Sequence, residues 1–252
     1  MDEEFHFAQA KTFASFQLHW HPALTTFPGA FVAAACILVW VPNSILVCRL
    51  VSGFFTIVLH LELQSFDVSM WSSVELVLMP VLFQVSYLFY TDSGATLFAI
   101  LTVLKMRRYD INPCWAFVAV AFRQTNIVWV FFAVAERILL DSRCQKDSEI
   151  LPFFAFCWKN KLIIIQKFKW FLLLAGSFVL FVFLNRGIVL GHQEHHKPVL
   201  HLAQLLYFAA FYVVCSPFQS FSTLLSIRWT RFNLIFMATA SLLSLYILEY
   251  YR

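Results

Sequence analysis

A single arginine interrupts an apolar stretch that is long enough to cross a bilayer. Residues 112–140 read NPCWAFVAVAFRQTNIVWVFFAVAERILL, and the polar segment 123–126 lies in the middle. A guanidinium at the centre of a hydrocarbon layer costs about 2.5 to 3.5 kcal/mol, so such a group almost always faces a protein cavity and a partner. The alternative is an arginine that pairs with a neighbouring carboxylate or extends to the membrane interface. Arg123 is therefore the first candidate functional residue.

The composition places the chain among membrane proteins. Of 252 residues, 61% are hydrophobic, 13% are charged and 30 are phenylalanines, values outside the usual range of soluble domains. Backbone groups in lipid must be paired within their own segment, and the apolar runs show no period of two, which favours helices. We predict an all-α, polytopic transmembrane fold. The net charge of +4 comes largely from loop residues and indicates cytosolic membrane-flanking loops rather than nucleic-acid binding.

Apolar segments recur along the whole chain and predict about seven to nine membrane segments. Several are shorter than the roughly 20 residues that span a bilayer upright. Prolines mark starts, ends and one kink, because proline removes a backbone donor and clashes with the preceding turn. The segments are approximately 27–41, 45–61, 73–90, 93–106, 113–140, 170–190, 201–218 and 232–248.

The distribution of lysine and arginine predicts the topology. Basic residues gather in loops near 105–108, 143–169 and 228–231, which the positive-inside rule places in the cytosol. Segment 113–140 must then leave and return to the cytosolic face, as two half-length helices meeting at 123–126 would do. We expect a single transmembrane domain over 1–252. Its parts are a luminal acidic loop at 1–26, membrane segments over 27–140, a basic cytosolic loop at 141–169, and membrane segments over 170–252 with a luminal loop at 191–200.

This topology collects polar groups on the luminal side. They are Asp2, Glu3, His6, Asp92, Arg123 and a histidine-rich stretch around 192–201. Adjacent carboxylates in an enclosed site can divide labour between a general base and a group that orients it or holds a cation, although an acidic chain start is also compatible with a solvated end. The histidines lack the helix register of a zinc hydrolase, which favours a polar-substrate loop or a solvated loop over a metal site. Six scattered cysteines form no CxxC pair and support neither a disulfide framework nor a zinc site.

Five ordered strings resemble the dolichyl-phosphate-glucose-dependent alpha-1,2-glucosyltransferases of the endoplasmic reticulum. The strings are MDEEFHFAQA at 1–10, HPALTTFPG at 21–29, LFYTDSG at 88–94, AFRQTNIVWV at 121–130, and NRGIVLG followed by HLAQLLYF within 185–208. FRQTNIVW is the most specific of them. The resemblance covers essentially the whole chain, although the loops between the strings match poorly.

The resemblance implies a fold of the GT-C type and an inverting transfer of glucose. The donor would be dolichyl phosphate glucose and the acceptor a dolichyl-diphosphate-linked Glc2Man9GlcNAc2 oligosaccharide, in the membrane of the endoplasmic reticulum with the active site facing the lumen. Asp2 matches the acidic residue used as the base, and Glu3 is its acidic neighbour. Arg123 and Gln124 are the candidates for the donor phosphate, because a guanidinium offers two parallel donors to a phosphate. Weaker candidates for substrate contacts are His6, Asp92, Asn126, His192, His201 and Gln204.

The resemblance leaves a cofactor open and suggests that the chain is a fragment. It identifies no certain cofactor, and the acidic residues leave a divalent cation as an alternative. Members of this family carry a helix before the acidic loop and further spans after the position of Arg252, so we expect a chain incomplete at both ends. Two other classes of function remain as alternatives. One is an inactive membrane adaptor or regulatory protein, and the other is a transporter with Arg123 in a polar pathway.

Overall fold

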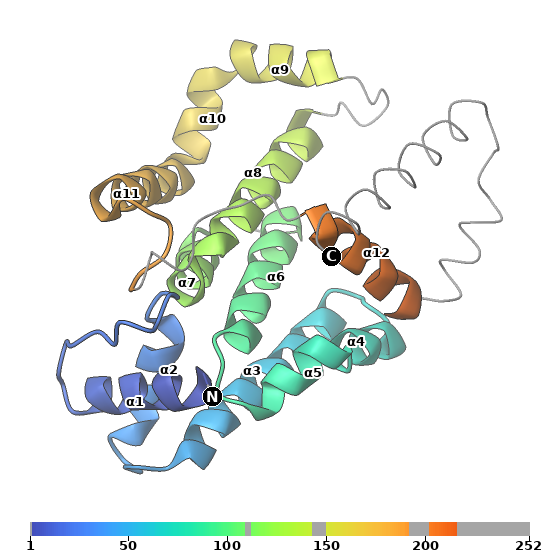
Figure 1. The fold of residues 1–252 in the computed structure, drawn as a ribbon. Helices are drawn as coiled ribbons and strands as arrows, with labels where there is room; N and C mark the ends of the chain where they lie inside the picture. Colours follow the sequence, from blue (N-terminus) through green and yellow to red (C-terminus); the bar gives the residue numbers. More distant parts are fainter. Residues whose placement is uncertain (1, 109–111, 143–149, 192–201, 216–252) are drawn as a thin grey trace. The chain divides into compact units, whose positions relative to one another are not determined.

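A computed structural model describes residues 2–108, 112–142, 150–191 and 202–215. Within these ranges the secondary structure is helical and no strand occurs, which confirms the all-α class. Contacts divide the chain into two compact units, residues 1–196 and 197–252, whereas the sequence was interpreted as one domain. The first unit contains all the helices discussed below except α12 (Figure 1).

The helices of the first unit are mostly short. They are α1 (Asp2–Ala14), α2 (Gly29–Leu38), α3 (Ile45–Ser65), α4 (Met70–Val77), α5 (Pro80–Tyr87), α6 (Asp92–Arg108), α7 (Cys114–Phe122), a 3-10 turn η1 (Gln124–Asn126), α8 (Ile127–Ser142), α9 (Ile150–Lys159), α10 (Lys161–Lys167) and α11 (Lys169–Asn185). The second unit contributes α12 (Leu202–Cys215). The segment 232–248 lies outside the described residues.

The number of expected membrane segments is not confirmed by helix length. Within the described residues, α3 is long and apolar enough to cross a membrane by itself. Two pairs of bent helices, α4 with α5 at 66° and α10 with α11 at 80°, raise the count to three if each pair forms one span. Pro80 begins α5 and explains the first bend, because it supplies no amide hydrogen to the turn before it. The expected segment 73–90 is therefore two helices.

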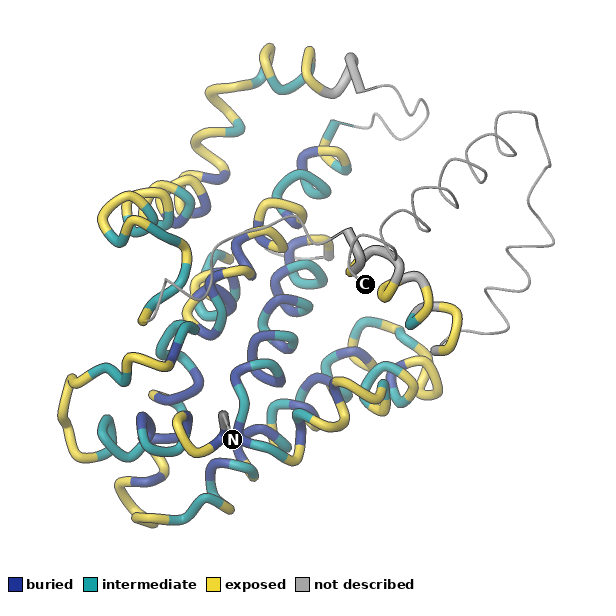
Figure 2. The backbone as a smooth tube through the Cα atoms, viewed as in Figure 1, coloured by how far each residue is buried: buried dark blue, intermediate teal, exposed yellow. Residues whose placement is uncertain are grey.

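Helix α6 forms the centre of the first unit. It packs against α3, α7 and α8, and Figure 2 shows it in the buried and intermediate colours along nearly all of its length, while the surrounding helices carry exposed segments. Five leucines that are almost fully buried join α3 and α5 to α6. They are Leu59, Leu63, Leu82, Leu97 and Leu101. This position makes α6 the element against which the functional residues are held.

Two glycines allow the close helix contacts that surround this core. A Cβ atom on Gly29 would lie 2.7 Å from the carbonyl oxygen of Ala121, and a Cβ atom on Gly94 would overlap the Phe122 ring. Helices that meet in a membrane associate through small residues, because lipid provides no hydrophobic drive between them and close van der Waals contact must supply it. Gly29 and Gly94 thus bring α2 and α6 against the end of α7.

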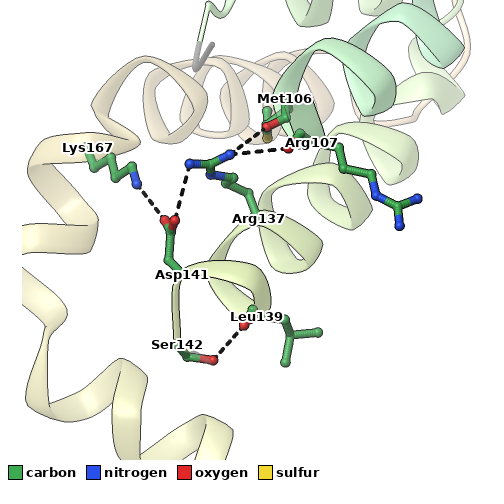
Figure 3. Close-up of polar contacts among 7 residues, drawn as sticks. All are labelled: Met106, Arg107, Arg137, Leu139, Asp141, Ser142 and Lys167. Atoms are coloured by element: carbon green, nitrogen blue, oxygen red, sulfur yellow. Dashed lines mark hydrogen bonds and ion pairs between the residues drawn. The ribbon is translucent and has the colours of Figure 1, made fainter. Parts of the chain in front are cut away.

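An ion-pair network fixes the other end of α6 (Figure 3). Arg137 of α8 donates to the carbonyl oxygens of Met106 and Arg107 at 3.3 Å each, and it pairs with Asp141 at 3.3 Å. Asp141 also accepts from Lys167 of α10. The last carbonyls of a helix have no partner within the helix, and a cationic side chain satisfies them favourably. Arg137 therefore ties the C-terminal end of α6 to α8 and, through Asp141, to α10.

Two segments expected as loops contain helices. The first part of 1–26 forms α1, and the described part of 141–169 forms α9 and α10. Helix α1 has almost no hydrophobic periodicity, because its acidic, aromatic and amide side chains are distributed around the helix. Its helical state instead depends on polar contacts with the rest of the unit, described below.

Candidate active site

The apolar stretch 113–140 is broken where the sequence predicts it. Helix α7 ends at Phe122, Arg123 adopts an extended backbone with φ −152° and ψ 119°, and α8 begins at Ile127 after the turn η1. The prediction of a helix break at 123–126 is confirmed, with 9 residues in α7 before it and 16 residues in α8 after it. An extended residue between two helices leaves backbone groups without helical partners, so this break needs support from side chains.

Asn126 supplies that support. Its side-chain Nδ2 donates to the carbonyl oxygen of Ala95 in α6 and to that of Ala119 in α7, both at 3.0 Å. The residue is buried, and its amide adds a hydrogen bond at the Ala119 carbonyl, which also accepts from the Arg123 amide at 3.1 Å. Asn126 thus links α6 and α7 to the turn η1 at the break. The substrate contact expected for Asn126 from the sequence stays a prediction.

Arg123 pairs with Asp92 across the start of α6. Its Nη1 contacts Asp92 Oδ1, and the two side chains are 40% and 34% exposed. Asp92 lies in the first turn of α6, where the free amides of the helix stabilise a negative charge. The pair brings together Arg123 and Asp92 from strings that are 31 residues apart in sequence. Because both groups are partly exposed, the guanidinium can still reach a second anion.

A cavity of about 600 Å³ opens beside this ion pair. Its polar end holds Asp92, Arg123, Thr125 and Asn126, whereas the remainder is lined by apolar residues of α6 and α8. Those residues are Ala95, Ala99, Ile100, Val103, Leu104, Trp129 and Phe132. Thr96 of α6 also lines this part of the cavity. One charged end and one apolar wall form a site that suits an anionic headgroup with a hydrocarbon tail.

Gln124 lies next to Arg123 but is directed elsewhere. Its Nε2 donates to the carbonyl oxygen of Thr25 at 2.6 Å, and the residue is buried. Its Oε1 is buried without a hydrogen-bond partner. Gln124 connects the break to the segment before α2 and does not line the cavity among the described residues.

The acidic start of the chain is held by a bidentate ion pair. Arg49 of α3 donates from Nε to Glu3 Oε1 at 2.8 Å and from Nη2 to Glu3 Oε2 at 2.7 Å. The amide of Phe89 donates to the same Oε1 at 2.8 Å. The Arg49 guanidinium, followed by the Phe89 amide, outweighs the effect of burial and lowers the pKa of the Glu3 carboxyl below its ordinary value. Glu3 is therefore ionised, and both of its carboxylate oxygens accept hydrogen bonds.

His6 binds the other polar group of Phe89. Its Nδ1 lies 3.0 Å from the Phe89 carbonyl oxygen, and its ring contacts the rings of Phe31 and Tyr90. Glu3 and His6 are one turn apart on α1, so together they hold the backbone just before Asp92. His6 is buried in this contact.

The remaining candidates from the sequence lie at the start of the chain, in the second unit or outside the described residues. The backbone of Asp2 begins α1 directly before Glu3. His192 and His201 lie outside the described residues. Gln204 is exposed on α12 in the second unit. Within the described residues, no three histidine, cysteine, aspartate or glutamate side chains converge in a way that could hold a metal ion.

Sequence reasoning overlooked Arg49 and two aromatic residues of the cavity wall. Arg49 is a lone cation in the apolar helix α3, which is the same signal that identified Arg123. Trp129 and Phe132 lie on α8 among many similar apolar residues, and nothing in their pattern distinguishes them from residues that face lipid.

Relatives of known activity match most of the chain. It is 27% identical over 95% of its length to a human protein named Dol-P-Glc:Glc(2)Man(9)GlcNAc(2)-PP-Dol alpha-1,2-glucosyltransferase, covering 62% of that protein. It is 30% identical over 90% of its length to the rat protein of the same name, covering 58% of it, and 27% identical over 89% to the one from Candida albicans, covering 55%. The chain thus spans a little over half the length of these relatives. No solved structure matches.

The family assignment covers nearly every residue. A family model for the DIE2/ALG10 family matches residues 1–251, including the strings around Glu3, Asp92 and Arg123. The chain belongs to the DIE2/ALG10 family.

Proposed function

We propose that this chain transfers glucose from dolichyl phosphate glucose to the lipid-linked Glc2Man9GlcNAc2 oligosaccharide and forms an alpha-1,2 linkage. Support comes from its family and from the printed activity of its relatives. The observation that carries the proposal is the Arg123 guanidinium at the polar end of a cavity whose other walls are apolar. A phosphate esterified to a long isoprenoid has the same division into an anionic end and an apolar chain.

The proposed reaction is a single displacement at the anomeric carbon. A carboxylate removes the proton of the attacking acceptor hydroxyl, the hydroxyl oxygen forms the new bond to C1, and the bond from C1 to the phosphate oxygen breaks with its electron pair going to dolichyl phosphate. Attack from the face opposite the beta-linked phosphate gives the alpha product. We propose Asp2 as the base, at the start of α1.

Arg123 would stabilise the negative charge that develops on the leaving phosphate. Its guanidinium remains protonated and can donate two parallel hydrogen bonds to phosphate oxygens. An interaction that strengthens as the phosphate leaves raises kcat, whereas one equally strong in the bound donor would not. In the structure Asp92 pairs with Arg123, so donor binding requires the phosphate to share or replace this carboxylate.

The proposal places the protein in the membrane of the endoplasmic reticulum, with the break at 123–126 facing the lumen. The apolar helices and the bent helix pairs support a membrane location. Dolichyl phosphate glucose, the dolichyl-diphosphate oligosaccharide and the surrounding bilayer are the proposed partners. A divalent cation, if one assists, would have to bind near the Asp92 carboxylate of the polar end.

Transfer by the purified chain tests this proposal. The chain is reconstituted into lipid nanodiscs with a synthetic dolichyl phosphate glucose and a diglucosylated lipid-linked acceptor, and triglucosylated product is measured with and without EDTA. Arg123→Lys should lower the rate by about 100-fold, because an ammonium cannot make the bidentate contact, while the protein still folds. Unchanged activity of Arg123→Lys would remove Arg123 from the mechanism.

A cellular assay separates an enzyme from an adaptor. In cells whose lipid-linked glycans stop at two glucoses, expression of the chain should restore the third glucose, and Arg123→Met should not. The matched control is Arg186→Met, because Arg186 follows α11 and does not line the cavity. Restoration by Arg123→Met would contradict the proposal.

A further inference from the structure

We infer that Arg49 and Glu3 are positioning residues that fix the start of α1, and with it Asp2, against the connection leading into Asp92. Glu3 does not itself take the proton. The inference rests on the proposed function for its kinetic consequence, but the contacts that carry it are independent of that function. It assigns a role to Arg49 and gives the two acidic residues at the start of the chain different roles: Asp2 is the proposed base, and Glu3 positions it.

The contacts of the Glu3 carboxylate leave it little capacity for proton transfer. Oε1 accepts from Arg49 and from the Phe89 amide, and Oε2 accepts from Arg49. The Glu3 side chain is 11% exposed. A general base must reach the proton that it removes and must exchange protons during turnover. A carboxylate held by three hydrogen bonds, two of them from a guanidinium, instead serves as an anchor.

The anchored backbone belongs to a segment with no helix of its own. Residues 88–91 connect α5 to α6, and Leu88 has an extended backbone with φ −103° and ψ 154°. Phe89 is almost fully buried, so its amide and carbonyl both need partners within the protein. Glu3 supplies the acceptor and His6 lies at hydrogen-bond distance from the carbonyl. One turn of α1 thereby satisfies both polar groups of this residue.

These contacts connect the acidic chain start with the anion site. Asp2 directly precedes Glu3, and consecutive Cα atoms are about 3.8 Å apart, so the position of Glu3 fixes that of the Asp2 backbone. Asp92 follows Phe89 by three residues and pairs with Arg123. Arg49 of α3 also holds the Glu3 carboxylate, through both of its oxygens. Four elements that are distant in sequence thus set the separation between the proposed base and the proposed phosphate site.

Kinetics of reconstituted variants test the role in the reaction. Arg49→Met should lower kcat by about 10- to 100-fold, because a misplacement of about 1 Å at a reacting group costs that much, while KM for the donor changes less than about threefold. Arg49→Lys should recover part of the loss. Lys105→Met is the matched control, because Lys105 also pairs with a glutamate of α3, Glu62, at 2.9 Å, but is not among the residues that line the cavity. Its kcat should match the unmodified chain.

The pH profile distinguishes a positioning residue from a base. Glu3→Gln retains an oxygen that accepts from the Phe89 amide and removes the carboxylate. If Glu3 only positions Asp2, the decline of kcat/KM at acid pH remains in Glu3→Gln at a lower maximum. Loss of that decline identifies Glu3 as the base and overturns the inference, as does an Arg49→Met variant with unchanged kcat.

Hydrogen exchange tests the contacts of Glu3 with Arg49 and Phe89 without any turnover. In the unmodified chain the Phe89 amide should exchange slowly, and Glu3→Ala and Arg49→Met should both accelerate exchange of residues 86–91 by at least about tenfold, whereas Lys105→Met should not. Unaltered exchange overturns the inference whether or not the chain is active. If the variants accelerate exchange but the unmodified chain transfers no glucose, the contacts of Glu3 with Arg49 and Phe89 stand. That result contradicts the proposed function alone.

Discussion

The Arg123 guanidinium meets the Asp92 carboxylate where α7 ends and α6 begins. The pair closes the polar end of the cavity whose apolar wall runs along α6 and α8. An arginine in the middle of an apolar stretch thus has both a protein partner and an accessible space beside it. That combination distinguishes Arg123 from Arg137, whose guanidinium is committed to carbonyl oxygens and Asp141 (Figure 3).

Removal of the Asp92 carboxylate should tighten binding of the product. A phosphate that reaches Arg123 must compete with Asp92, and a partly exposed ion pair is worth about 0.2 to 1 kcal/mol. Asp92→Asn should therefore lower the inhibition constant of dolichyl phosphate by about two- to fivefold in the transfer assay. Weaker inhibition would show that Asp92 supports the phosphate rather than competing with it.

Substitution of Gly94 should destabilise the contact between α6 and α7. A Cβ atom there would overlap the Phe122 ring directly before Arg123, and overpacking costs about 1 to 3 kcal/mol. Gly94→Ala should unfold at lower temperature than the unmodified chain in nanodiscs. Gly176→Ala is the control, because a Cβ atom at Gly176 in α11 meets nothing within 4 Å. It should be neutral or slightly stabilising.

Asn126 should be indispensable for the helix break. Asn126→Asp removes both donors and places a carboxylate beside the carbonyls of Ala95 and Ala119. A buried polar group without a partner costs about 1 to 3 kcal/mol, and a carboxylate facing two carbonyl oxygens costs more. We expect a clear loss of thermal stability and of transfer, with Ser177→Ala on α11 within about 0.5 kcal/mol of the unmodified chain as the control. An unchanged melting temperature would refute the structural role of Asn126.

The Glu3 ion pair should make stability depend on pH in the acid range. Arg49 lowers the pKa of Glu3 in the folded chain below its ordinary value of 4.5. The contribution is complete above the ordinary value and is lost as the pH falls through the lowered, folded value. The difference in unfolding midpoint between the unmodified chain and Glu3→Gln should thus be constant near neutral pH and shrink under acid conditions. A difference that grows as the pH falls would contradict this sign.

The sequence was most informative where polar residues interrupt an apolar run. The segment 123–126 is surrounded by helix-forming apolar residues, so a break there could be located to the residue. Arg123 was identified for the same reason, since a cation in such a run requires a partner. The partner itself, Asp92, appeared only as a weaker candidate because nothing local relates positions 31 residues apart.

The remaining differences also have physical causes. Helix α1 was expected as a loop because its stabilising contacts are with residues 49 and 89, far along the chain. The expected number of membrane segments is not confirmed within the described residues, because most of the helices there are shorter than a span and two pairs are bent by 66° and 80°. The structure adds backbone carbonyl partners for the amides of Gln124 and Asn126, and the substrate contacts expected for both residues stay predictions.

Photo-labelling tests the central claim most directly. A photoreactive isoprenoid phosphate is irradiated with the chain in nanodiscs, and the labelled peptides are mapped with and without excess dolichyl phosphate. The account predicts competed labelling in residues 95–104 and 125–132, the walls of the cavity, and loss of that labelling in Arg123→Met. Labelling confined to other helices, or labelling of the cavity that is unchanged in Arg123→Met, would contradict it.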